Sequence, residues 1–175
     1  GNQIELVMQE VSLAGENNEI TVAVSLLSTA GQHYSAKVTM SKVPAQSGET
    51  VSHLPKLKPL GLNNYYDGEV LFHQGEFQTI HEITGSSDKG IEGLLCASSD
   101  GALANSTLPK TTVLDGGLQI ALLWVWQKMG GGSLPLSIES MKTYPADFSG
   151  EVFCQVLVQS SSKTKARVDI AYHNA

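Results

Sequence analysis

The sequence predicts an α+β fold in which an antiparallel sheet wraps around one long helix. Short segments rich in β-forming residues, separated by turn residues, occupy both ends of the 175-residue chain. Between them, the segment 113–128 (VLDGGLQIALLWVWQK) is apolar on nearly every side and is followed by the glycines at 130–132, which are typical of a helix C-terminus. A helix that is apolar all round must be covered by other elements rather than laid on a surface.

The first forty residues predict an antiparallel meander. We expect strands over 4–13, 20–28 and 33–40, because these segments are rich in β-formers and are separated by the turn sequences AGENNE and TAGQ. The segment 41–64 holds three of the six prolines and shows neither a helical nor a strand period. We therefore expect a linker over 46–64.

Residues 65–175 predict a second unit, built from strands on both sides of the helix. The expected elements are strands at 69–85 (with a turn at Gln74-Gly75) and 89–98, a helix at 112–128, and strands at 134–143, 151–159 and 164–172. An antiparallel sheet curled around one buried helix is the hotdog fold. Residues 1–45 resemble the closing strands of another such unit, so the predicted architecture is a partial or atypical double hotdog. A β-sandwich with one inserted helix is the alternative.

Composition narrows the classes of function. The chain is 41% hydrophobic and 16% charged with a net charge of −6, and its Lys and Arg residues are scattered, which disfavours a nucleic-acid partner. The longest apolar run, 120–126, is far shorter than a membrane span. Cys96 and Cys154 lie outside any metal-binding spacing, so we expect reduced thiols, a cytoplasmic location and no metal site.

The head of the helix carries an unusual polar pair. Asp115 and Gln119 are four residues apart and therefore share one helix face. In one interpretation, the helix dipole favours a carboxylate at this position and Asp115 has no chemical role. In the other, the two residues belong to a functional site. Gly116 and Gly117 cost about 1 kcal/mol each in helix propensity. They either permit close packing against the sheet or let a ligand approach bare backbone amides.

Three segments carry a resemblance to a known family. YDGEVLFHQGEFQTI (66–80), VLDGGLQIALLW (113–124) and SLPLSIESMK (133–142) resemble, in order and spacing, the C-terminal half of dehydratase domains of polyketide synthases and polyunsaturated-fatty-acid synthases. The resemblance covers roughly residues 60–175. Its D-x-x-x-Q/H motif matches Asp115 and Gln119, which implies that Asp115 protonates a departing 3-hydroxyl group and that Gln119 holds the carboxyl.

The same resemblance implies the substrate and the partners. The substrate would be a 3-hydroxyacyl chain on the phosphopantetheine of an acyl carrier protein, converted to a trans-2-enoyl chain without another cofactor. Expected partners are the carrier protein and other domains of the same synthase, with no nucleic acid and no membrane, and a homodimer stays open. The residues expected along the substrate path are Tyr66, Phe72, His73, Phe77, Gly116, Gly117, Leu134 and Pro135. For His73, a solvent-facing loop position is favoured over a role as a base.

Two departures from the family pattern limit this interpretation. The family's base is the histidine of an H-x-x-x-G-x-x-x-x-P motif, and none of the five histidines begins that motif. Gln74-Gly75 stands where the family usually has glycine-proline. We therefore expect either a dehydratase whose base comes from outside this chain or a non-catalytic, dehydratase-like domain that scaffolds the synthase or binds acyl chains or carrier protein.

Overall fold

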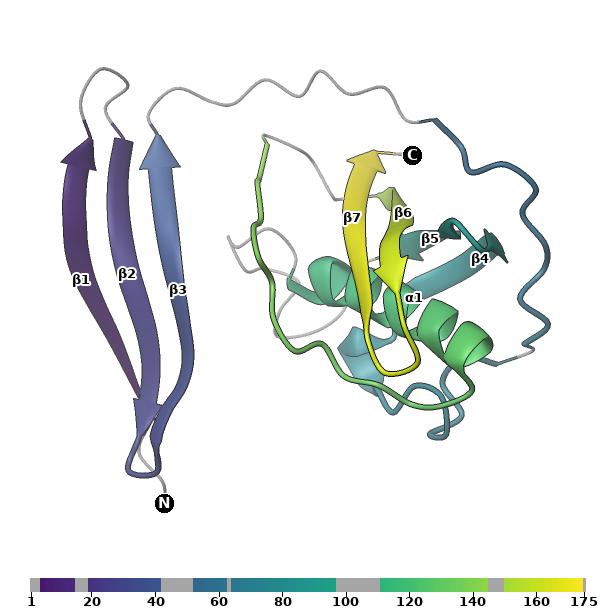
Figure 1. Cartoon of the computed structure of the whole chain (residues 1–175), viewed down its shortest axis with the longest axis horizontal. Helices are drawn as coiled ribbons and strands as arrows, with labels where there is room; N and C mark the ends of the chain where they lie inside the picture. Colours follow the sequence, from purple (N-terminus) through teal and green to yellow (C-terminus); the bar gives the residue numbers. More distant parts are fainter. Residues whose placement is uncertain are drawn as a thin grey trace. The chain divides into compact units, whose positions relative to one another are not determined.

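The structure, a computed structural model, describes most of the chain in two compact units. The described residues are 4–14, 19–41, 52–62, 64–96, 111–144 and 150–174. The first unit comprises Gly1–Gly48 and Thr143–Pro145, and the second comprises Glu49–Lys142 and Ala146–Ala175. Within the described residues there are two antiparallel sheets and one α-helix (Figure 1), so the predicted α+β class with antiparallel sheets is confirmed.

The first unit is a three-stranded meander. Its strands β1 (Ile4–Ala14), β2 (Glu19–Ser28) and β3 (Gly31–Ser41) pair in the order β1-β2-β3, with every neighbour antiparallel. The strands predicted over 4–13, 20–28 and 33–40 are confirmed. A two-residue turn at 29–30 joins β2 to β3.

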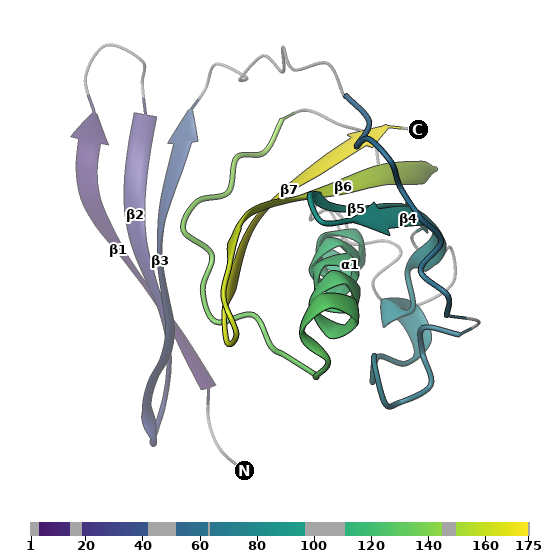
Figure 2. The same cartoon turned by 45° about the vertical axis from the view of Figure 1, so that its right-hand side comes forward.

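The second unit packs one helix on a four-stranded sheet. The strands β4 (Ile80–Ser87), β5 (Gly90–Cys96), β6 (Glu151–Ser161) and β7 (Ala166–Asn174) lie in the order β4-β5-β6-β7, all antiparallel. The helix α1 (Thr111–Met129) lies against one face of this sheet (Figure 2) and contacts all four strands.

The core of the second unit lies between α1 and the sheet. Its side chains without solvent exposure come from β5, β6 and the helix, and they are Ile91, Leu95, Val113, Ile120, Leu123, Val152, Cys154 and Val156. Burial of this apolar surface is the main force that holds the helix on the sheet. Among the described residues, no helix is both long and apolar enough to cross a membrane.

Two predicted strands differ from the observed structure. Of the strand predicted over 69–85, only β4 forms, and the residues before Ile80 are a loop with a short 3-10 turn, η1 (Gly75–Phe77). The strand predicted over 134–143 is wrong, because this segment is irregular and its side chains are exposed, with Leu136 at 83%. Pro135 has no N–H to donate to a sheet, and no face of the segment is buried to stabilise an extended pairing.

Part of the predicted linker over 46–64 is attached to the second unit. Lys58 and Ser86 exchange backbone hydrogen bonds of 2.9 and 2.8 Å. The Leu54 N–H donates to Glu92 Oε1 at 2.6 Å, and Glu92 is completely buried in β5. These contacts tie the described residues 52–62 to the edge and face of the four-stranded sheet.

Candidate functional site

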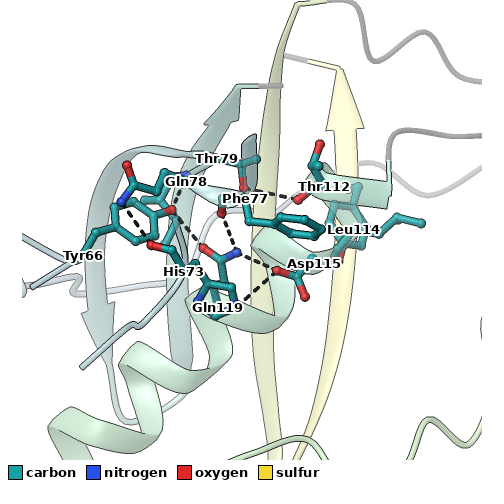
Figure 3. A network of polar contacts seen from close by, with 11 residues as sticks. Tyr66, His73, Phe77, Gln78, Thr79, Thr112, Leu114, Asp115 and Gln119 are labelled. Carbon is teal, nitrogen blue, oxygen red and sulfur yellow. Dashed lines mark hydrogen bonds and ion pairs between the residues drawn. The ribbon is translucent and has the colours of Figure 1, made fainter. Parts of the chain in front are cut away.

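The candidate site lies where the loop before β4 meets the first turns of α1 (Figure 3). The loop contributes Tyr66, His73 and Phe77, and the helix contributes Asp115 and Gln119. The structure thus brings together five residues that the sequence singled out, from two segments far apart in the chain.

Local turns and one buried side chain shape the loop. Asp67 accepts hydrogen bonds from the backbone N–H groups of Val70 and Glu69, each at 2.9 Å, and these bonds lower the pKa of the Asp67 carboxyl. Leu71 is 1% exposed and anchors the loop in the core. Gly75 has a φ of 58°, in the left-handed region that favours glycine, and it begins the turn predicted at Gln74-Gly75.

Gln119 is the centre of the polar network. Its side chain is buried, its Oε1 accepts from the Tyr66 hydroxyl at 2.9 Å, and its Nε2 donates to the Phe77 carbonyl at 2.8 Å. The second Nε2 hydrogen goes to Asp115 Oδ2 at 2.6 Å. Because an amide has two N–H donors and both are used, the nitrogen end of Gln119 is fixed toward Asp115.

Tyr66 fixes the other end of the same amide. The Ile80 N–H donates to the Tyr66 hydroxyl oxygen at 2.9 Å, so the hydroxyl directs its own hydrogen to Gln119. Burial, together with the charge of nearby Asp115, raises the pKa of Tyr66. The hydroxyl therefore keeps the proton that it donates to Gln119.

His73 faces Asp115, which corrects the favoured interpretation of this residue as a solvent-facing loop histidine. Its Nε2 lies 3.4 Å from Asp115 Oδ2, and the two side chains are 13% and 30% exposed. The His73 Nδ1 is buried and has no hydrogen-bond partner in the part of the chain that the structure describes. Phe72 stacks on the imidazole, with ring centroids 4.6 Å apart, and is itself largely exposed.

The helix glycines pack against protein, which corrects their expected place on the substrate path. A Cβ at Gly116 would collide with Thr79 Oγ1, and a Cβ at Gly117 would collide with the Tyr172 hydroxyl and ring. Tyr172 also donates to the Leu114 carbonyl at 2.6 Å. Of the two alternatives left open by the sequence, the observed one is close helix–sheet packing.

Leu134 and Pro135 lie in the irregular segment that follows the C-terminal end of α1. Their side chains are exposed, with Leu134 at 67%. The expected substrate contacts of these two residues therefore lack support from the geometry around Asp115.

The contacts of three residues around the site were not predicted from the sequence. Tyr66 was expected along the substrate path, yet its hydroxyl is engaged within the protein. Thr79 and Tyr172, which cover the helix glycines, were not singled out. The paired glycines at the helix start were the available signal, because they predicted that something packs closely there.

No protein-family model matches the chain, and comparisons with curated proteins and with solved structures give no match. Within the described residues, no group of three or more His, Cys, Asp or Glu side chains could hold a metal ion.

Proposed function

We propose that the second unit is a hotdog domain of the dehydratase type, acting on 3-hydroxyacyl chains carried by an acyl carrier protein. Support for the fold comes from the antiparallel four-stranded sheet packed on a single buried helix. Support for the activity comes from the resemblance of the three sequence segments and from one observation in the site. That observation is the Gln119 amide, which is held by Tyr66 and Phe77 so that it donates to Asp115.

The geometry suits the role of an acid. Elimination of water from a 3-hydroxyacyl thioester needs a base for the α-proton and an acid for the departing hydroxyl. Gln119 occupies one acceptor site of Asp115 Oδ2, which favours Oδ1 as the oxygen that carries a proton. The carboxyl is 30% exposed and is accessible to a substrate. A base from outside this chain would take the proton from C2 while Asp115 gives its Oδ1 proton to the C3 hydroxyl. The C3–O bond would break, the C2=C3 double bond would form, and water would depart.

A second candidate is a non-catalytic, dehydratase-like domain that binds acyl chains or carrier protein. One specific observation favours it: the sequence contains no H-x-x-x-G-x-x-x-x-P motif, which carries the base in the family that the chain resembles. In this alternative the polar network only stabilises the head of α1.

Turnover of a surrogate substrate tests the proposal. The chain is incubated with a 3-hydroxyacyl pantetheine thioester, or with the same acyl group on a carrier protein, in the presence of imidazole as the base that the chain itself does not supply. The enoyl product is followed by mass spectrometry. We expect product from the wild type, loss of product with Asp115→Asn, and full activity with Asp88→Asn. Asp88 is an exposed carboxylate that pairs with Lys128 and serves as the matched control.

Absence of product from the folded wild type would contradict the enzymatic proposal. Retention of the acyl carrier protein on the inactive chain in a binding assay would then support the second candidate. Equal activity of wild type and Asp115→Asn would contradict the assignment of Asp115 as the acid.

A further inference from the structure

All five histidines lie within the described residues, and of the four in the second unit only His73 faces Asp115. The other three have different surroundings. His53 pairs with Glu92 at 3.0 Å, His81 pairs with Glu151 at 3.5 Å, and the His173 ring lies 6.5 Å from that of Phe153. His73, at 3.4 Å from Asp115, is thus the one histidine of this unit whose chemistry bears on the candidate acid.

We infer that His73 is a positioning residue, which directs its Nε2–H to Asp115 Oδ2 and leaves Oδ1 as the reactive oxygen. This inference rests on the proposed function, since it assigns His73 a part in the same reaction. His73 thereby adds a second donor to Asp115 Oδ2, which already accepts a hydrogen bond from Gln119.

The environment of the imidazole favours a proton on Nε2 over a proton on Nδ1. Among the described residues, the buried His73 Nδ1 has no hydrogen-bond partner, so a proton on Nδ1 would be a buried donor with no acceptor there. Leaving such a donor unpaired costs about 1–3 kcal/mol. A proton on Nε2 instead points toward a carboxylate. A proton on Nε2 is therefore the arrangement that best satisfies the ring.

The loop holds the imidazole in this orientation. The Phe72 ring stacks on it at an interplanar angle of 16°, and Gln78 Nε2 donates to the His73 carbonyl at 3.0 Å. The Nε2–Oδ2 distance of 3.4 Å is longer than the usual N–H···O range of about 2.7–3.2 Å. Hydrogen bonds of catalytic groups are often long without substrate and shorten in the complex.

The consequence for the reaction concerns which oxygen carries the proton. With Gln119 and His73 both directed at Oδ2, a proton on Asp115 is confined to Oδ1. The acid then presents one defined oxygen to the leaving hydroxyl instead of two alternatives. Loss of the His73 donor should lower kcat and leave KM little changed, because His73 does not need to touch the substrate.

Nitrogen NMR of the whole chain tests the pairing without any assay of activity. In the wild type at neutral pH, we expect long-range ¹H–¹⁵N spectra to show His73 with Nε2 protonated and Nδ1 unprotonated. Asp115→Ala should change the His73 nitrogen shifts, whereas Asp88→Asn should leave them unchanged. A proton on Nδ1 in the wild type, or His73 shifts that ignore Asp115→Ala, would overturn the inference.

Two substitutions at His73 test the positioning role. His73→Gln keeps an N–H donor on the side chain, and His73→Phe keeps a planar ring without a donor. We expect His73→Phe to lose up to about tenfold in kcat, as for removal of one hydrogen bond to a neutral carboxyl group, and His73→Gln to retain most of it. Equal kcat values for the two variants would overturn the positioning role.

The two experiments separate this inference from the proposed function. A wild type that shows no turnover contradicts the proposed function, and the NMR spectra still decide whether His73 donates to Asp115. If the wild type is active and His73→Phe has the same kcat, the proposed function stands and the positioning role of His73 is rejected. If His73→Phe does not fold, as judged by circular dichroism, the wild-type and Asp115→Ala spectra remain decisive.

Discussion

The Tyr66 hydroxyl donates to Gln119 Oε1 at 2.9 Å and accepts the Ile80 N–H at 2.9 Å. This one hydroxyl joins the loop before β4, the first residue of β4 and the third turn of α1. It therefore fixes the Gln119 amide whose other end holds Asp115. The orientation of Asp115 therefore depends on the hydrogen bond between Tyr66 in the loop and Gln119 in the helix.

Removal of that hydroxyl should weaken both the fold and the site. Tyr66→Phe leaves the Ile80 N–H and Gln119 Oε1 without their partner, and each unsatisfied buried group costs about 1–3 kcal/mol. We expect a fall of at least about 2 kcal/mol in the free energy of unfolding, measured by urea denaturation. Turnover in the assay of the proposed activity should also fall. Tyr34→Phe, at an exposed position of β3, is the control and should change neither. An unchanged urea midpoint for Tyr66→Phe would argue against the network.

The close approach of α1 to the sheet should make Gly117 intolerant of a side chain. A Cβ there would meet the Tyr172 ring, and the Tyr172 hydroxyl would lose its bond to the Leu114 carbonyl. Overpacking costs about 1–3 kcal/mol, against about 1 kcal/mol gained in helix propensity. We expect Gly117→Ala to destabilise the unit by about 2 kcal/mol in thermal or urea unfolding.

The matched control for this substitution is Gly131→Ala. A Cβ at Gly131 would meet no atom within 4 Å, and its φ lies outside the left-handed region. Its effect should remain within about 0.5 kcal/mol. A Gly117→Ala variant as stable as the Gly131→Ala variant would contradict the close packing of the helix on β7.

Glu92 should hold residues 52–54 on the sheet. Its buried carboxylate accepts from the Leu54 N–H at 2.6 Å and from Gln155 Nε2 at 2.7 Å, and it lies 3.0 Å from His53 Nδ1. Glu92→Ala leaves one hydrogen-bond donor of Leu54 and one of Gln155 unpaired. At about 1–3 kcal/mol for each, the free energy of unfolding should fall by about 2–6 kcal/mol. Hydrogen exchange should show the Leu54 amide unprotected in this variant. Protection of the Leu54 amide equal to that in the wild type would contradict the attachment of residues 52–54 through Glu92. Glu82→Ala, at an exposed position of β4, is the control.

The two cysteines should differ in reactivity. Burial raises the pKa of the Cys154 thiol above its ordinary value, whereas Cys96 is exposed at the end of β5. The thiolate is the reactive form, so at about pH 8 Cys154 stays protonated as well as shielded. We expect iodoacetamide to label Cys96 in the folded chain and to label Cys154 only in denaturant, as read by peptide mass spectrometry. Labelling of Cys154 in a folded Cys96→Ser variant would contradict the burial of this thiol.

The helix and most strands were predictable because their signals are local. Alternating β-formers between turn residues predicted β1, β2 and β3, and the apolar segment with its terminal glycines predicted α1 to within one residue at each end. The 134–143 segment has the same local alternation but forms no strand. Strand pairing needs a partner with free N–H and C=O groups, which a local pattern does not contain.

The sequence by itself determined the α+β class, the helix, and the pairing of Asp115 with Gln119, because residues four apart on a helix share a face. Only the tertiary structure decided that His73 faces Asp115 and that Tyr66 holds Gln119. Those contacts depend on the path of the loop before β4, which is set by the burial of Leu71 and by the fit of the helix glycines against Thr79 and Tyr172. Packing between distant segments leaves no periodic signal in the chain. The sequence therefore favoured an exposed position for His73, whereas the structure places its ring next to the candidate acid Asp115.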